Sequence, residues 1–137
     1  MKGLSLFIPV YNEAQLLEPN LARLRVFLEA LNLPFEIIVG SNGSLDATVA
    51  IGRGLAQADR RLIFFHLEAK GPGAAFREGV RRARFDYIIT QDMDLSVDLG
   101  FIPLALAALD ECDLVIGSKR LGAQRRSWVR IVGSGAY

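Results

Sequence analysis

Short apolar runs recur along the chain, and segments with a helical pattern separate them. The runs are rich in Ile, Val and Phe and lack a clean alternation with polar residues, which is typical of strands that are buried on both faces. Five runs have this character: residues 4–10, 35–39, 62–67, 87–91 and 114–117. The pattern therefore predicts five short, buried strands.

The segments between these runs place apolar residues three and four positions apart, which is the spacing of one helix face. The clearest example is a stripe of five leucines, Leu17, Leu21, Leu24, Leu28 and Leu31. Pro19 suggests that this helix begins near Glu18, because proline is tolerated in a first helical turn. Three further helices are predicted to begin near Ser44, Gly73 and Pro103.

The alternation of strands and helices predicts an α/β protein of the Rossmann-like type, with a mainly parallel sheet and helices on both faces. The 137 residues suffice for one compact domain, and 51% hydrophobic residues suffice for its core. In such sheets, ligands bind at the carboxyl ends of the strands. Polar clusters follow four of the predicted strands, at residues 9–13, 40–44, 70–73 and 92–94. We therefore expect a ligand site at this edge of the sheet.

Two carboxylates one residue apart, Asp92 and Asp94, follow the fourth apolar run. Like charges at this spacing repel each other unless a cation shares them. Mg²⁺ or Mn²⁺ held by only one or two carboxylates keeps coordination positions open for phosphate oxygens. The pair therefore predicts a metal site that grips a nucleoside diphosphate. A solvated acidic turn is the alternative interpretation.

The loops after the second and third predicted strands offer further contacts. Glycines flank Ser41 and Asn42, so the chain can turn tightly there, and both side chains can hydrogen-bond a base or a ribose. A plain helix-capping loop explains the same two residues. Lys70 precedes a glycine-rich helix start that can face an anionic donor, although a surface lysine is equally ordinary at this position.

Composition and spacing argue against several other chemistries. Cys112 is the only cysteine, which excludes an internal disulfide and a thiolate zinc site. His66 is the only histidine and lies in an apolar run, so we expect a structural histidine and not a Ser-His-Asp hydrolase. Residues 71–76 match only the first half of G-x-G-x-x-G, so a dinucleotide is not the expected ligand. Without a signal-peptide pattern or a run of about 20 apolar residues, a cytoplasmic protein is expected.

The chain carries 16 basic and 15 acidic residues, which gives a formal net charge of +1 at pH 7. This balance argues against a nucleic-acid partner recruited by overall charge. The stretch from residue 114 to the end has no acidic residue, and its basic residues are Lys119, Arg120, Arg125, Arg126 and Arg130. A solvated charged face explains such a stretch. An anionic substrate or membrane surface would require the same residues.

Five segments resemble, in the right order, the inverting family 2 glycosyltransferases of the GT-A fold. They are the opening signature at residues 8–13, the second-strand segment at 36–48, the third loop and helix at 70–79, the D-x-D motif at 92–95 and the following strand at 113–120. The glycine-rich third loop and the basic segment near Arg125 are similar to the polyprenyl-phosphate (dolichyl-phosphate) mannosyl- or glucosyltransferase group. Five collinear motifs make the resemblance specific.

The resemblance implies a role for each matching residue. Pro9, Tyr11 and Glu13 would hold the base and the ribose of the nucleotide. Asp92 and Asp94, as the catalytic pair, would hold Mg²⁺ or Mn²⁺ on the diphosphate. Further contacts with the nucleotide sugar are expected from Ser41, Asn42, Lys70, Lys119, Arg120 and Arg125. The implied reaction moves a hexose from a donor of the GDP-mannose or UDP-glucose type to an acceptor such as a polyprenyl phosphate.

Two departures from the family pattern favour an alternative without catalysis, and the D-x-D motif itself allows another. The usual Asp-Asp-Gly-Ser is here Ser-Asn-Gly-Ser at residues 41–44, and the chain ends at Tyr137, where the family begins its acceptor-binding half. We therefore expect residues 1–137 to form one incomplete glycosyltransferase domain. Its expected location is the cytoplasm, either free or peripheral on the cytoplasmic face of a membrane. One alternative is a non-catalytic nucleotide-sugar-binding remnant. The other is a phosphohydrolase of the haloacid dehalogenase type, whose D-x-D normally follows the first strand.

Overall fold

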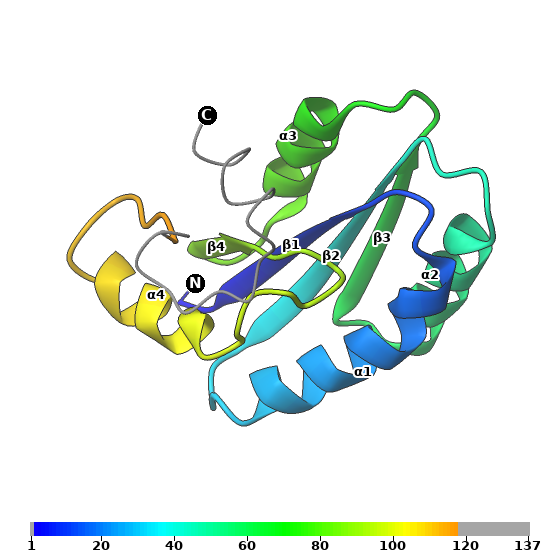
Figure 1. Cartoon of the computed structure of the whole chain (residues 1–137). Coiled ribbons are helices and arrows are strands. Elements are labelled where there is room, and N and C mark those ends of the chain that lie inside the picture. The colour runs from blue at the N-terminus through cyan, green and yellow to red at the C-terminus, as the bar shows by residue number, and fades with distance from the viewer. Residues whose placement is uncertain (1, 118–137) are drawn as a thin grey trace, which may run out of the picture.

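The computed structural model describes residues 2–117 of the chain. Within this part, strands and helices alternate strictly (Figure 1). The strands are β1 (Leu4–Val10), β2 (Phe35–Asn42), β3 (Leu62–Leu67) and β4 (Tyr87–Thr90). The helices are α1 (Ala14–Glu29), α2 (Thr48–Ala58), α3 (Pro72–Arg82) and α4 (Phe101–Leu109). The α/β architecture predicted from the sequence is confirmed.

The four strands form one parallel sheet in the order β3-β2-β1-β4, so the first strand of the chain lies in the interior of the sheet. β1 pairs with β2 along its whole length and with β4 on its other edge. β2 also pairs with β3, as far as Asn42 opposite Leu67. Because all four strands are parallel, their carboxyl ends lie at the same edge of the sheet (Figure 1). The loops that carry the polar clusters leave the sheet at this edge.

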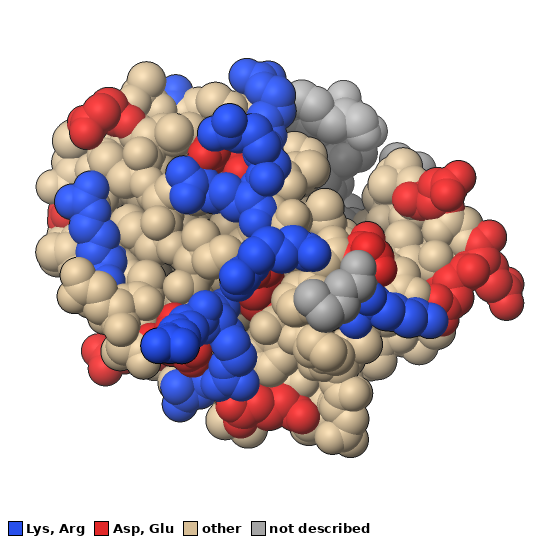
Figure 2. Space-filling view, turned by 180° about the vertical axis from the view of Figure 1, so that it is seen from behind, with Lys and Arg blue, Asp and Glu red and all other residues tan. Residues whose placement is uncertain are grey.

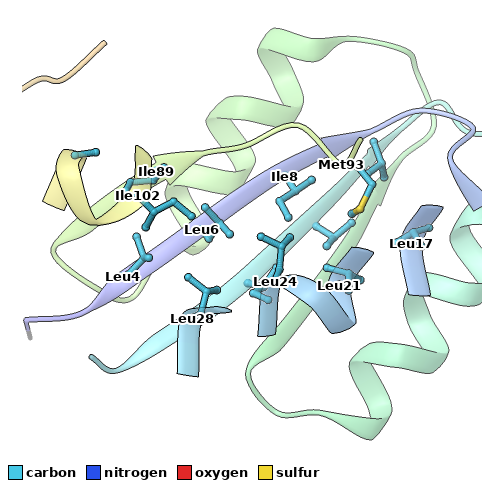
Figure 3. Packing of buried hydrophobic residues seen from close by; sticks show 14 residues of the cluster. Leu4, Leu6, Ile8, Leu17, Leu21, Leu24, Leu28, Ile89, Met93 and Ile102 are labelled. Atoms are coloured by element: carbon cyan, nitrogen blue, oxygen red, sulfur yellow. The ribbon is translucent and has the colours of Figure 1, made fainter. Parts of the chain in front are cut away.

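Helices cover both faces of the sheet. On one face, the leucine stripe of α1 packs against the apolar side chains of β1, and residues of α2 and α4 complete this core (Figure 3). On the other face, Ala75 of α3 packs against Phe7, Ile38 and Phe65 of the first three strands. Burial of a large aliphatic side chain contributes about 1.5–3 kcal/mol. These two cores therefore hold the sheet rigid beneath the loops.

Helix α1 begins at Ala14, so the expected start near Glu18 is wrong by about one turn. Pro19 lies inside the helix. The early start is stabilised from outside the helix, because the backbone N–H groups of Glu13 and Ala14 donate to Thr48 Oγ1 and Asp46 Oδ2. Helix starts require such partners for their free N–H groups. Nothing in the local sequence of α1 reveals that a distant loop supplies them.

The fifth predicted strand does not form: residues 114–117 are not paired with any strand among the described residues. Leu114 and Ile116 are 73% and 78% exposed, whereas Val115 packs against the main core. The apolar character of residues 114–117 predicts a strand that is buried on both faces. A strand needs a partner for its backbone N–H and C=O groups, and this segment pairs with none of the described strands.

One face of the molecule carries a band of Lys and Arg side chains with acidic side chains beside it (Figure 2). Several described arginines are paired locally. Glu78 forms ion pairs with Arg81 and Arg82 at 2.7 Å, and Glu36 pairs with Arg84 at 2.6 Å. These partners reduce the positive charge that this part of the chain offers to a polyanion.

Candidate functional site

The loops after β1, β2 and β3 meet at the carboxyl edge of the sheet. Asn12 of the first loop hydrogen-bonds Ser44 of the second. The ammonium of Lys70, in the third loop, lies 3.9 Å from the centroid of the Tyr11 ring. The structure thus brings together residues that are far apart in the sequence.

Asn12 joins the first loop to the second through both its backbone and its side chain. Its N–H donates to Ser44 Oγ at 3.1 Å, and its Oδ1 accepts from the N–H groups of Leu45 at 2.8 Å and Asp46 at 3.3 Å. Asn12 has a φ of 49°, in the left-handed region that asparagine tolerates better than most residues. This conformation and these bonds fix the chain between Tyr11 and Glu13.

A second set of bonds fixes the start of α1 to the start of α2. The Glu13 N–H donates to Thr48 Oγ1 at 3.0 Å, and the Ala14 N–H donates to Asp46 Oδ2 at 3.3 Å. Asp46 also accepts from the N–H and the hydroxyl of Thr48. These bonds to Thr48 lower the pKa of Asp46 below its ordinary value. Asp46 and Thr48 therefore support the candidate site, a role that sequence reasoning missed.

Tyr11 presents an aromatic ring at the site. It is 39% exposed, and Lys70 lies over the ring. Gly43 makes this approach possible, because its φ is +75° and a Cβ there would lie 2.9 Å from the Lys70 backbone nitrogen. Only glycine suits both conditions. The result is a ring and an ammonium side by side, which can contact a nucleotide base and an anionic group.

Ser41 and Asn42 face the protein and not the solvent. Ser41 is fully buried, donates to Ser44 Oγ at 2.9 Å and lies 3.0 Å from His66 Nδ1. Asn42 is 5% exposed, and its Nδ2 donates to the Val10 carbonyl at 3.1 Å. Both are in β2, which extends three residues beyond its predicted end. Their side chains brace the first loop from beneath.

The three candidates of the first loop differ in exposure. Tyr11 is exposed, whereas Glu13 and Pro9, which belongs to β1, are partly buried. Burial raises the pKa of the Glu13 carboxyl. The negative charges of Asp94, Asp92 and Asp46 raise it further, whereas a hydrogen bond from the Tyr11 backbone opposes the shift. The fourth loop therefore acts electrostatically on the first.

Asp92 and Asp94 are both exposed, and Met93 between them is only 1% exposed. Met93 belongs to the main core (Figure 3). Its carbonyl accepts from Asn20 Nδ2 at 2.8 Å. Asp94 Oδ1 accepts from the Ser96 N–H at 3.0 Å. An anchored residue with an accessible carboxylate on each side suits an ion at the surface. Met93 is the anchor that sequence reasoning missed, although its apolar character is the signal.

The donor set fits a cation that shares its ligands with a substrate. Within residues 2–117, no three His, Cys, Asp or Glu side chains are grouped so as to hold a metal without help. Mg²⁺ commonly takes one or two carboxylates and completes its shell with water and phosphate oxygens. Burial is the main cause of the raised pKa of Glu13, and the negative charges of Asp94 and Asp92 at the same edge raise it further. Asp92 and Asp94 thus match Mg²⁺ or Mn²⁺ together with a bound diphosphate.

Two hollows in the described part of the chain lie away from these loops. One of about 440 Å³ is lined by residues such as Leu33, Phe35 and Phe85, and another of about 230 Å³ lies among residues of α1, α2 and β3. Neither is lined by a candidate residue. The exposed side chains of Tyr11, Asp92 and Asp94 place the candidate site at the protein surface. Three expected contact residues, Lys119, Arg120 and Arg125, lie outside the described residues.

The family model for glycosyl transferase family 2 matches residues 5–130. The chain belongs to this family. Its parallel sheet and its helices agree with the GT-A type of fold. Enzymes of the GT-A type typically use a divalent metal.

Curated relatives of the chain act on polyprenyl phosphates according to their names. The undecaprenyl-phosphate 4-deoxy-4-formamido-L-arabinose transferase of Pseudomonas syringae pv. syringae (strain B728a) is 33% identical over 132 residues. That alignment covers 95% of this chain and 39% of the relative. The dolichyl-phosphate beta-glucosyltransferase of Drosophila melanogaster is 35% identical over 99 residues, covering 66% of this chain and 30% of the relative. The chain thus spans less than half the length of these relatives.

A solved structure, S. aureus TarS 1–349 in complex with UDP, shares the fold with a TM-score of 0.58. Its sequence is 23% identical, and the alignment covers 91% of this chain and 38% of TarS 1–349. At this identity the likeness supports the fold alone. Within residues 2–117, no helix has both the length and the apolar character needed to cross a membrane.

Proposed function

We propose that this chain binds a nucleotide-diphosphate sugar and forms the donor half of a hexosyltransferase. The observation that carries the proposal is the convergence of an aromatic ring, a lysine and carboxylates at the carboxyl edge of a parallel sheet. Tyr11 and Lys70 are in contact, and Glu13 lies within electrostatic reach of Asp92 and Asp94. Family membership supports the reaction class.

In this proposal each group recognises a different part of the donor. The Tyr11 ring stacks on the base, beside Pro9, and the Glu13 carboxylate accepts hydrogen bonds from the base or the ribose. Lys70 leaves the face of the ring to pair with the diphosphate. Ser41 and Asn42 act from beneath by holding the first loop in place.

Asp92 and Asp94 hold Mg²⁺ or Mn²⁺ against the diphosphate. A divalent cation at this position neutralises the charge that develops on the departing nucleoside diphosphate. The two carboxylates are suited to this because Met93 and the Asp94–Ser96 hydrogen bond fix the backbone between and after them. Donors of the GDP-mannose and UDP-glucose types are both compatible with these groups.

The acceptor that we propose is a polyprenyl phosphate, because the two relatives described above are named for undecaprenyl and dolichyl phosphates. Its phosphate is already an anion, so it needs little help from a general base. It does need positive charge, which the basic residues Lys119, Arg120 and Arg125 can supply. The acceptor would place the domain at the surface of a membrane.

A second candidate function is nucleotide-sugar binding without transfer. It is favoured by one observation: Ser41 and Asn42, at positions where the family usually has two aspartates, are buried and occupied by contacts within the protein. Transfer of sugar to a polyprenyl phosphate, or hydrolysis of the donor, would distinguish an enzyme from this binder. The family match removes the support for a phosphohydrolase of the haloacid dehalogenase type.

Calorimetric titration of the chain with GDP and UDP, with Mn²⁺ or with a chelator, tests the proposal. At least one diphosphate should bind, and the chelator should weaken it strongly. Asp94→Asn should weaken metal-dependent binding about tenfold or more, because one charge of the coordinating pair is lost. Asp98→Asn removes a nearby exposed carboxylate and is the matched control. Equal affinity of Asp94→Asn and parent in Mn²⁺ would contradict the metal role.

A further inference from the structure

The only histidine of the chain is connected to the candidate nucleotide site through two serines. His66 Nδ1 lies 3.0 Å from Ser41 Oγ, and the Ser41 hydroxyl donates to Ser44 Oγ at 2.9 Å. Ser44 Oγ in turn accepts from the backbone N–H of Asn12 at 3.1 Å. This row of hydrogen bonds runs from the third strand to the loop that carries Tyr11 and Glu13.

We propose that His66 is a positioning residue for nucleotide binding, which acts through Ser41 and Ser44 on the first loop without touching the ligand. The inference rests on the proposed function, since it assigns a role in the same site. Sequence reasoning gave His66 a purely structural place in β3.

The register of the sheet makes the row possible. Ser41 of β2 pairs with His66 of β3 on one side and with Val10 of β1 on the other. The last residues of three strands are therefore neighbours in space. Ser41 lies between His66 and Val10, so a hydrogen bond made by His66 is only one strand away from the first loop.

Burial gives the row its strength. Ser41 is fully buried, Ser44 is 6% exposed and the His66 side chain is 11% exposed. Water therefore has little access to replace a lost partner, and a buried polar group without a partner is costly. The groups must satisfy one another.

The direction of the hydrogen bonds indicates how His66 would act, which is by orienting the hydroxyl of Ser41. Ser41 has one hydroxyl proton, and it donates this proton to Ser44. The contact between His66 Nδ1 and Ser41 Oγ fits the tautomer that is protonated at Nδ1, and we assign this tautomer because its N–H would hold the Ser41 hydroxyl in the direction of Ser44. The other ring nitrogen lies 3.8 Å from the exposed carboxylate of Glu68, too far for a hydrogen bond.

The first loop depends on this support because Asn12 has a left-handed backbone conformation. Such a conformation persists only where the surrounding contacts hold it. When the Ser41 hydroxyl is free to rotate, Ser44 loses one of its partners and the hold on the Asn12 N–H weakens. We expect Tyr11 and Glu13, on either side of Asn12, to lose their fixed spacing.

Three substitutions at His66 separate the task of Nδ1 from the size of the side chain. The amide of Asn reaches the position of Nδ1, the amide of Gln reaches that of Nε2, and Phe keeps the ring without a nitrogen. We expect His66→Phe and His66→Gln to weaken binding of GDP or UDP with Mn²⁺ about tenfold, which is the effect of one buried hydrogen bond. His66→Asn should bind close to the parent, and Glu68→Gln is the control that should not change.

A double-mutant cycle with Ser41→Ala tests whether His66 acts through Ser41. If it does, adding His66→Phe to Ser41→Ala causes no further loss of nucleotide affinity. Additive losses, or a loss for His66→Asn as large as for His66→Phe, would overturn the assignment. So would a fall in affinity that the lowered melting temperature of the ligand-free variant fully explains.

Nucleotide binding by the parent protein distinguishes a failure of the His66 role from a failure of the proposed function. A parent that binds GDP or UDP while all His66 variants bind equally well overturns the positioning role alone. A parent that binds neither diphosphate overturns the proposed function, and with it the role assigned to His66.

Discussion

At the scale of the residue, Glu13 combines partial burial with a negative neighbourhood, and both raise its pKa above the ordinary value of 4.5. The folded state therefore binds a proton at Glu13 more tightly than the unfolded state does. The stabilising contribution is fully present below pH 4.5 and is lost as the pH rises through the raised folded-state pKa. At neutral pH the ionised carboxylate opposes folding.

We therefore predict that Glu13→Gln raises the melting temperature of the ligand-free protein at pH 7 and weakens nucleotide binding. The stability advantage of the variant should shrink as the pH falls through the raised pKa toward 4.5. Thermal denaturation at several pH values and calorimetry with nucleotide check the two effects. A variant that is less stable than the parent at pH 7 would instead give Glu13 a structural role.

Gln91 is a second residue whose burial has a measurable consequence. It is 4% exposed, and its Nε2 has no hydrogen-bond partner among the described residues. A buried donor without a partner costs about 1–3 kcal/mol. We predict that Gln91→Met raises the free energy of unfolding by about 1 kcal/mol, measured by urea denaturation. The exposed Gln57→Met should have little effect, and a loss of stability in Gln91→Met would show that the amide has a partner.

At the scale of the element, a buried carboxylate joins three segments at the amino ends of the strands. Glu36 of β2 is fully buried and accepts from the hydroxyl of Ser5 in β1 at 2.7 Å. It also accepts from the backbone N–H and the Nε of Arg84 at 2.8 Å and 2.6 Å. The Phe85 N–H donates to Ser5 Oγ at 3.2 Å. This arrangement links β1 and β2 to the segment that leads into β4.

We predict that Glu36→Ala lowers the free energy of unfolding by about 2–3 kcal/mol, because it leaves buried donors without acceptors. Glu36→Gln should cost less, since it keeps part of the hydrogen bonding. Chemical denaturation gives the values, and the exposed Glu111→Ala is the matched control. Nucleotide affinity of the folded variants should equal that of the parent, because Glu36 lies at the end of the sheet opposite the candidate site.

The elements also show which structural features the sequence can reveal. The first, third and fourth strands match their apolar runs to within one residue, because burial on both faces leaves a strong local signal. The run at residues 114–117 has the same signal and yet is not a strand, since pairing depends on a neighbour elsewhere in the chain. The start of α1 was missed for a related reason, because Asp46 and Thr48 stabilise it from another loop.

The candidate site also combines features that the local sequence reveals with features that depend on distant parts of the chain. Alternation of strands and helices was enough to place the four polar clusters at one edge of the sheet. It was not enough to orient individual side chains. Ser41 and Asn42 are buried because β2 continues past Val39 and pairs on both sides, which no local pattern indicates. The position of Lys70 over Tyr11 likewise depends on the glycine turn at Gly43.

At the scale of the whole molecule, a nucleotide and a metal at the carboxyl edge would connect loops from all four strands. A ligand that binds only the folded state stabilises it by about 2.7 kcal/mol at a concentration of 100 times its Kd. We predict that GDP or UDP with Mn²⁺ raises the melting temperature by several degrees and that a chelator removes most of this shift. The matching nucleoside, which lacks phosphates, should give no metal-dependent shift. Equal shifts with and without metal would contradict the role of the aspartates.

The position of β1 within the sheet has a consequence for the synthesis of the protein. β1 is made first, but one of its edges is covered only when Leu4 can pair with Tyr87. The unit β1-α1-β2 can assemble early on the ribosome, whereas the other edge of β1 must wait until β4 has emerged. An uncovered strand edge invites pairing with other chains, and distant pairings form slowly. A nascent or cleaved chain that stops before Tyr87 therefore exposes to aggregation a strand that is almost wholly buried in the folded protein.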